Sequence, residues 1–473
     1  LASTLHEERN QQGYTETIAS SGKAAVTGNQ GTLSIEAGRD ITAEAAEISS
    51  AGNIAMKAGR DITMETAAVK KDTAVTWDGN NYRHDSAARD IGSSVTAKGS
   101  LTMQSERDIS IKAADIRSEG MTAVKAGRNL TVENGKEITD LEEHHRHKER
   151  SLLSSTTTTT HDEVHAVQAQ KSIIEGNTVS LQGGKDISLT GSAAASTKET
   201  ALSAGRNISI HAAEETNKEI HKKQVKKRGL IGSRLGFTIG SEKKKDSYDT
   251  EETTQRGSTV GSVKGNVTIT AGQTASVSAS DIIAGKDTLI TGRNVDIESK
   301  DNTYRGKEEH EYKKSGLTVS LGGTAVNAAR DIAAPVRRAG EVGDGRLKAL
   351  YALQAGMNAR DIQKNQKTDK AINKNNAVGI NISLGSTGWK DHAETITEET
   401  KGSRITAGRT AAVIAKEDMT VKGSTVNAQD IHLTAGNNIH ILSSENKSTT
   451  IEDYKAKSGS IGASISKGGY GIG

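Results

Sequence analysis

The sequence of 473 residues has no cysteine, a single proline at Pro335 and few aromatic residues: one Phe, two Trp and eight Tyr. Without cysteine, the chain has neither a disulfide framework nor thiolate chemistry. The near absence of proline, together with glycines that lack a three-residue period, excludes a collagen-like helix. Because aromatic rings are scarce, the interior has to be filled by Ile, Val, Leu, Ala and Met.

Charge and hydropathy exclude two further classes. The chain has 62 Lys and Arg against 59 Asp and Glu, and this net charge of +3 gives no general attraction to nucleic acid. No apolar run approaches the roughly 18 to 20 residues of a membrane-spanning helix. The chain starts at Leu1 without a signal peptide and stops within a repeating pattern, so we expect a segment of a longer protein.

The sequence does contain a recurring phrase. Gly38-Arg39-Asp40-Ile41-Thr42 returns at residues 59–63, twenty-one residues later, and similar intervals recur along the chain. A fixed period of this size predicts a solenoid, in which each repeat buries its apolar face only against its neighbours.

Within each repeat, apolar residues are spaced by two. The residue between them is mostly polar, which predicts a strand with one buried face. Glycine at the start of each phrase supplies a tight corner, and the following Asp or Asn is a turn residue. The sequence therefore predicts about a dozen coils of two or three short strands each. Examples of the alternating pairs are Leu33/Ile35, Ile62/Met64, Leu130/Val132, Ile208/Ile210, Val295/Ile297 and Ile439/Ile441.

Charged excursions interrupt these coils. We expect repeats with three excursions within residues 1–298, a long excursion at 299–403, further repeats at 404–443 and the start of another excursion at 444–473. The three early excursions lie at about 70–86, 136–172 and 214–258. The polar stretch from Glu142 to Thr160, with its run of threonines, is predicted to remain unfolded.

Other parts of the excursions show alternating strands rich in Gly and Ser, embedded among lysines. These strands carry Leu235/Phe237/Ile239, Leu317/Val319/Leu321, Val378/Ile380/Ile382/Leu384 and Ile461/Ala463/Ile465. Inside the long excursion, the spacing of Leu347, Leu350 and Tyr351 predicts a helix near 344–356.

The repeated phrases resemble the haemagglutinin-type repeats of filamentous haemagglutinins and of contact-dependent growth inhibition exoproteins, which Gram-negative bacteria secrete through two-partner systems. The residues that carry the resemblance are AGRDI at 37–41 and 58–62, AGRNL at 126–130, AGRNI at 204–208 and AGNNI at 435–439. The stretch RLKALYALQAG at 346–356 looks like a helix of the second repeat region of the growth inhibition proteins.

The resemblance implies an all-β, right-handed parallel β-helix that is secreted and displayed on the bacterial surface. It implies either a segment that helps bring a C-terminal toxin across the outer membrane of a target cell, or the passive adhesive shaft of a haemagglutinin-like adhesin. The implied partners are the target outer membrane or one of its proteins, and an outer-membrane secretion partner reached through a region absent here. An immunity protein would concern only the missing toxin.

Candidate chemical sites are weak. The histidines His144, His145, His147, His161 and His165 lack a spacing that places three of them on one rigid face, so no metal is predicted. The glycine-rich stretch 229–236 lacks the Gly-Lys-Ser/Thr ending of a phosphate loop, and the Gly-Arg-Asp corners lack the paired glycines of a calcium roll. Acidic residues recur with the repeat instead of converging once. We therefore predict a non-enzymatic chain without a cofactor.

One strong basic patch is present. It consists of Lys222, Lys223, Lys226, Lys227 and Arg228, with Arg234 and Lys243 to Lys245 following. Clustered lysines attract anionic lipopolysaccharide or lipid headgroups, and the alternative is a solvated hairpin. Nucleic acid is not predicted, because no aromatic residues are interleaved for base stacking.

The alternating strands give the sharpest hypothesis. Hairpins that carry Phe237, Val319 and Ile382 pair along the side of the rod, and some rearrange to engage the target outer membrane. Their apolar alternations are shorter than the roughly 9 to 11 residues with which a strand crosses a bilayer, so alone they would not span it. The alternative is a set of static hairpins, since sheet edges are normally paired or covered.

Overall fold

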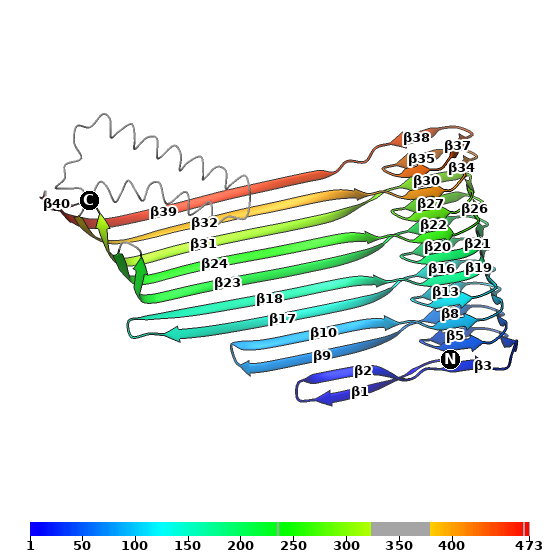
Figure 1. The fold of residues 1–473 in the computed structure, drawn as a ribbon, viewed down its shortest axis with the longest axis horizontal. Helices are drawn as coiled ribbons and strands as arrows, with labels where there is room; N and C mark the ends of the chain where they lie inside the picture. Colours follow the sequence, from blue (N-terminus) through cyan, green and yellow to red (C-terminus); the bar gives the residue numbers. More distant parts are fainter. Residues whose placement is uncertain (234–235, 323–378, 467–468, 473) are drawn as a thin grey trace.

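The computed structural model describes residues 1–233, 236–322, 379–466 and 469–472. None of these residues forms a helix, and so none forms a helix able to cross a bilayer. The strands build a stack of coils and a broad antiparallel sheet that extends from it (Figure 1). The predicted all-β fold with a parallel β-helix is confirmed. The helix predicted near 344–356 lies outside the described residues.

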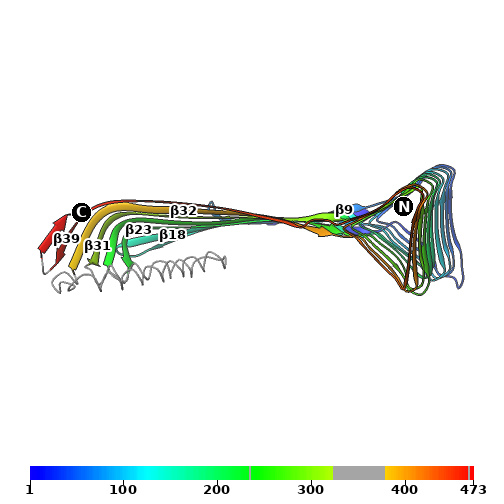
Figure 2. The same cartoon turned by 90° about the horizontal axis from the view of Figure 1, so that it is seen from above.

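The coils have three strand columns, which give the stack a triangular cross-section (Figure 2). One column is a parallel sheet of ten strands, one per described coil: β5 (Ile41–Glu44), β8 (Ile62–Glu65), β13 (Ile109–Lys112), β16 (Leu130–Glu133), β20 (Ile187–Thr190), β22 (Ile208–His211), β27 (Thr274–Ser278), β30 (Asn294–Glu298), β35 (Met419–Lys422) and β38 (Ile439–Leu442).

The other two columns belong to one parallel sheet. The first column contains β3 (Lys23–Val26), β6 (Glu47–Ser50), β11 (Ser94–Ala97), β14 (Asp115–Ser118), β25 (Thr259–Ser262), β28 (Asp281–Ala284), β33 (Arg404–Ala407) and β36 (Thr425–Asn427). The second contains β4 (Leu33–Ala37), β7 (Ile54–Ala58), β12 (Leu101–Ser105), β15 (Met121–Ala126), β26 (Asn266–Ala271), β29 (Thr288–Gly292), β34 (Thr410–Ala415) and β37 (Asp430–Ala435). Strands β19 (Ile173–Gly183) and β21 (Ala193–Ala204) run through both columns and join them.

The core is a stack of like residues. Ile109 pairs with Ile62 of the coil before and Leu130 of the coil after, and all three side chains are fully buried. This is the alternation that the sequence predicts, with one strand face in the core and the other in water. Stability therefore comes from contacts between neighbouring coils.

Six hairpins leave the coils in the described part of the chain, and their strands form one antiparallel sheet of twelve, the hairpin sheet. In sheet order the pairs are β1 (Thr4–Asn10) with β2 (Gly13–Ser20), β9 (Ala67–Asp78) with β10 (Asn81–Ile91), β17 (Gly135–Arg150) with β18 (Ser154–Gln170), β23 (Ala213–Ser233) with β24 (Gly236–Arg256), β31 (Lys300–Gly322) with β32 (Gly379–Lys401), and β39 (Lys447–Ser466) with β40 (Gly469–Ile472).

The hairpins join because their width matches the rise of the coils. Each later hairpin leaves after a strand of the ten-stranded column, and two coils separate it from the hairpin before. Two coils rise about 9.6 Å, and two antiparallel strands also occupy about 9.6 Å, since both spacings are about 4.8 Å. Each hairpin therefore meets the next one in hydrogen-bonding register, as β18 meets β23 and β24 meets β31.

Two expectations from the sequence are wrong. The stretch from Glu142 to Thr160 is not unfolded, because it contributes to the paired strands β17 and β18. Threonine is β-branched and favours a strand, and neighbouring strands satisfy the backbone on both sides. The hairpins also do not lie along the rod: they extend away from it and pair with one another (Figure 1). The hairpin of β1 and β2 was not predicted.

Candidate partner-binding face

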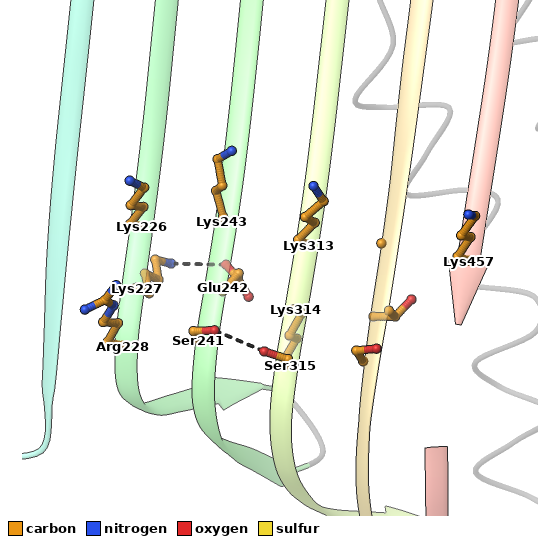
Figure 3. A pocket seen from close by; sticks show the side chains of 13 residues that line it. Lys226, Lys227, Arg228, Ser241, Glu242, Lys243, Lys313, Lys314, Ser315 and Lys457 are labelled. Carbon is orange, nitrogen blue, oxygen red and sulfur yellow. Dashed lines mark hydrogen bonds and ion pairs between the residues drawn. The ribbon is translucent and has the colours of Figure 1, made fainter. Parts of the chain in front are cut away.

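Rows of cross-strand partners run across the hairpin sheet, and the members of one row share a face. One row contains five lysines from five strands, Lys148, Lys226, Lys243, Lys313 and Lys457, with Thr157 and Gly388 in the remaining two positions. Two residues further out on the same face, Arg150 and Arg228 share a row with Ser241, Ser315 and Ser386. We call the five lysines and two arginines the basic band. Figure 3 shows Lys226, Arg228, Lys243, Lys313 and Lys457 of this band.

Among the described residues, Glu311 is the acidic residue that forms ion pairs with the basic band. Glu311 binds Lys313 at 2.5 Å and Lys243 at 3.3 Å. The hydrogen bond from Lys313 holds the pKa of the Glu311 carboxyl below its ordinary value, so this carboxyl stays ionised at neutral pH. Within the described residues, Lys148, Lys226, Arg228 and Lys457 have no ion-pair partner. The band therefore keeps a large positive excess.

Two shallow grooves follow the basic band. One, of about 460 Å³, is lined by Lys226, Lys243, Lys313 and Lys457 among others (Figure 3). The other, of about 410 Å³, is lined by Arg146, Lys148, Lys226 and Arg228 together with threonines of β18. Because Lys226 and Arg228 line both grooves, the two form one cationic surface across the strands.

The predicted basic patch is divided between two faces by the strand alternation. Lys226 and Arg228 belong to the basic band, and Lys222 lies four residues before Lys226 on the same face. Lys223 and Lys227 point to the opposite face, where Lys227 lies 4.0 Å from Glu242. The sequence prediction did not assign Lys148, Lys313 and Lys457 to the patch. Their shared row depends on the register between hairpins far apart in the chain.

Beyond the basic band, four adjacent strands each place a glycine in the same row: Gly229, Gly240, Gly316 and Gly385, the glycine row. The backbone φ is +100° at Gly229 and +148° at Gly316. A Cβ at Gly240 would lie 2.0 Å from the carbonyl oxygen of Ser315. At this row the strands curve, as Figures 2 and 3 show.

Past the glycine row, the rows become apolar on the face that carries Lys226. The strand ladder has no register shift here, so the alternation continues. A hollow on the opposite face shows the same continuity, because Lys314 and Thr387 before the glycine row line it together with Thr318 and Ser383 beyond it. We call the apolar residues the apolar band: Leu230, Ile239, Leu317, Leu384 and Ile461 in one row, Phe237, Val319 and Ile382 in the next, and Leu321, Ile380 and Ile465 in a third.

The predicted residues Phe237, Val319 and Ile382 are direct cross-strand neighbours in this band. Most of the band is exposed: Leu384 retains 63% and Ile461 78% of its accessible surface. The polar residue Thr238 on the opposite face is 1% exposed. On that opposite face Ile231, the cross-strand partner of Thr238, is also buried, so the exposed apolar residues of this end of the sheet lie on the face of the basic band.

The histidines do not form a metal site. His144 and His161 are cross-strand partners with ring centroids 5.7 Å apart, and Tyr82 stacks on His144 at 5.6 Å. His145 and His165 instead bind Glu143 and Asp140. Across the parts of the chain that the structure describes, no group of three His, Asp or Glu side chains is arranged to hold a metal ion.

The described residues of the glycine-rich stretch, 229–233 and 236, belong to the paired strands β23 and β24, whereas a phosphate loop opens a helix. Residues 234–235 of this stretch, which include Arg234 of the predicted basic patch, lie outside the described residues. Acidic residues of the coils form ion pairs with arginines of the neighbouring coil. Asp281, for example, pairs with Arg404 at 3.3 Å, and Asp287 pairs with Arg409.

Comparison with known proteins explains the repeat unit. The sequence matches the family described as Hemagglutinin repeat at residues 77–156, 153–242, 239–346 and 383–473. The first two matches begin close to the turn of one hairpin and end close to the turn of the next. The family unit therefore corresponds to a returning strand, two coils and an outgoing strand.

Curated relatives cover most of the chain. It is 32% identical over 411 residues to a 16S rRNA endonuclease CdiA of Enterobacter cloacae, a match that spans 83% of this chain and 12% of the relative. It is 30% identical over 474 residues to a deoxyribonuclease CdiA of Dickeya dadantii, spanning 98% of this chain and 14% of the relative. The chain thus spans only about an eighth of the length of these relatives. No solved structure matches.

Proposed function

The chain belongs to the hemagglutinin-repeat family and is a repeat region of a secreted, surface-exposed contact-dependent growth inhibition exoprotein. From this premise we propose that the chain helps a C-terminal toxin cross the outer membrane of a target bacterium. The segment acts without catalysis of its own. The nuclease activities in the relatives' names are those of the relatives.

The observation that supports this proposal is the exposed apolar band. A passive shaft has no use for a surface with Phe237, Ile239 and Leu384 in water, since such patches favour aggregation unless a partner or a membrane covers them. The band also lies at the end of the hairpin sheet away from the coils, where it can reach another cell's surface (Figure 1).

Flotation with outer-membrane vesicles tests this role. In the variant Phe237→Ser, Val319→Ser, Ile382→Ser, we expect at least about tenfold less protein to float, because three apolar side chains together contribute several kcal/mol of transfer free energy. The control is Ile396→Ser, Ile451→Ser, which changes exposed residues on the same face nearer the coils. Equal flotation of wild type and triple variant would contradict a membrane role for the apolar band.

The second candidate function is the adhesive shaft. The long, continuous stack of coils supports it, because a solenoid of this kind holds a distant tip away from the cell. A shaft requires length alone. It therefore predicts that the triple variant leaves the parent protein's activity unchanged.

A further inference from the structure

The basic band places like charges side by side. Lys226, Lys243 and Lys313 are direct cross-strand partners on adjacent strands, and strands lie about 4.8 Å apart. Like charges directly opposite one another destabilise a sheet, and Glu311 offsets only part of this repulsion. An anionic ligand would remove the remaining cost.

The row beyond these lysines adds hydrogen-bond donors. Arg228 lies beside Ser241, and Ser241 Oγ lies 3.1 Å from Ser315 Oγ. A guanidinium fork, ammonium groups and hydroxyls together suit the several oxygens of a phosphate group. Because the strands are paired on both sides, the donors are held in place before a ligand arrives.

The apolar band next to the basic band indicates which class of anionic ligand fits this face. On the same face, the small hydroxyl side chains of Ser241, Ser315 and Ser386 lie between the lysines of the basic band and the apolar band, and the glycine row adds no side chain. From Lys243 to Phe237 the chain runs six residues, about 20 Å of strand, which is comparable with the ~15 Å half-thickness of a bilayer's hydrocarbon core. A molecule with phosphate at one end and acyl chains at the other fits both bands.

We propose that the basic band and the apolar band together form a binding surface for a phosphorylated, acylated sugar of the Gram-negative outer leaflet, with its phosphates on the basic band and its acyl chains on the apolar band. This inference rests on the proposed function for the presence of the target outer membrane. A free polyanionic polysaccharide would use the basic band and leave the apolar band in water. Nucleic acid would require aromatic rings among the cations, which the basic band lacks.

Lysines on the opposite face provide a matched control. The test variant is Lys226→Gln, Lys243→Gln, Lys313→Gln, and the control is Lys223→Gln, Lys244→Gln, Lys300→Gln. Each control lysine lies on the same strand as one test lysine, strand alternation turns it to the other face, and none of the three lines either groove of the basic band. Both variants lose three positive charges, so a difference between them reports position and not net charge.

The measurement is binding of the 473-residue chain to phosphatidylcholine vesicles that contain diphosphoryl lipid A, monophosphoryl lipid A or phosphatidylglycerol at equal surface charge. We expect wild type to bind the diphosphoryl vesicles most tightly. We expect the test variant to lose at least about tenfold in affinity and the control less than about threefold, since lysines near an anionic surface contribute roughly 1 kcal/mol each. A circular dichroism melt confirms that both variants fold.

Three outcomes would overturn the proposal. They are equal losses in the two variants, no preference for diphosphoryl lipid A over phosphatidylglycerol, or equally tight binding of the deacylated, phosphorylated sugar. Each of these leaves intact the membrane role that the apolar-band variant tests. If vesicle binding survives in both the basic-band and the apolar-band variants, the proposed function fails as well.

Discussion

Asp186 illustrates how single side chains fix the stacking of coils. Its Oδ1 accepts hydrogen bonds from the backbone N–H of Asn207 in the next coil at 3.1 Å and from the side-chain amide of Asn207 at 3.0 Å. Arg206 pairs with the same carboxylate. Equivalent contacts join Asp108 to Arg128 and Asn129. The Gly-Arg-Asp phrase therefore recurs because each coil must bind the coil that follows.

Protonation of Asp186 should weaken its contacts with Arg206 and Asn207 of the next coil. The hydrogen bond from Arg206, followed by those from Asn207, holds the pKa of the Asp186 carboxyl below its ordinary value. A lowered folded-state pKa contributes stability that is present above the unfolded pKa of about 3.9 and is lost as pH falls through the folded value. We expect Asp186→Asn to cost about 1 kcal/mol at pH 7 and almost nothing at pH 2.

Hydrogen exchange of the amides of β20 and β22 at the two pH values checks this expectation. Ser188→Ala, a change at an outward position between the buried Ile187 and Leu189, is the control. If Asp186→Asn lowers the stability of β20 and β22 equally at pH 7 and pH 2, the carboxylate charge does not contribute to the contact between the two coils.

Residue patterns predicted the coils well and the partner-binding face only in part. The outgoing strands repeat a Lys-Lys-x-Gly-Leu phrase at 226–230 and 313–317, and this signal could have identified the basic and apolar bands together. The sequence analysis assigns Phe237, Val319 and Ile382 to hairpins that pair, but it does not give the register of that pairing. Their common row depends on pairing between strands up to about 80 residues apart, as for Phe237 and Val319, and no local pattern encodes that register.

At the scale of the element, the hairpin and the pair of coils form one unit. Where a coil turns without a hairpin, a residue with positive φ makes the corner, as at Ala113 with φ of +48° and Gly191 with +52°. Where a hairpin leaves, a buried serine closes the corner instead. Ser258 Oγ donates to the carbonyl of His211 at 2.6 Å and accepts from the N–H of Ser192 at 3.1 Å.

Removing one hairpin should divide the hairpin sheet and leave the coils stacked. The change replaces residues 135–172 by a direct corner that copies Ala113-Ala114. Strands β10 and β23 then lose their partners β17 and β18. They cannot pair with each other instead, because three strand spacings, about 14.4 Å, separate them. We expect amide protection to fall at least about tenfold in β10 and β23 and to stay within about threefold in β13 and β20.

Hydrogen exchange followed by mass spectrometry measures this change segment by segment. Shortening the same hairpin only at its turn, residues 151–153, is the control, because it leaves the pairing of β10 and β23 in place. Unchanged protection in β10 and β23 would mean that hairpins are stable alone, contrary to the account of matched spacing.

The excursions show why element types are easier to predict than their partners. Charged stretches that lose the repeat period identify where the chain leaves the coils. The simple composition of the threonine run Thr156 to Thr160 predicts an unfolded segment, yet the run pairs with β17 on one side and β23 on the other. Backbone hydrogen bonds from both neighbours, which composition does not report, decide the outcome.

The whole molecule has two parts with different tasks. The coils hold their core between stacked strands, and the hairpin sheet carries the basic band, the glycine row and the apolar band away from them (Figures 1 and 2). The hairpin sheet lengthens by two strands for every two coils, so each family repeat enlarges both parts together. A longer array would therefore have a wider hairpin sheet without altering how each hairpin leaves its coil.

The most direct test of the central claim uses the full-length parent exoprotein carrying Phe237→Ser, Val319→Ser, Ile382→Ser. Attachment to target cells and arrival of the C-terminal cargo inside them are scored separately, with Ile396→Ser, Ile451→Ser as the control. The account predicts attachment within about twofold of wild type and cargo arrival reduced at least about tenfold, since loss of about 1.4 kcal/mol changes an equilibrium tenfold. Loss of attachment, or cargo arrival equal to wild type, would contradict the account.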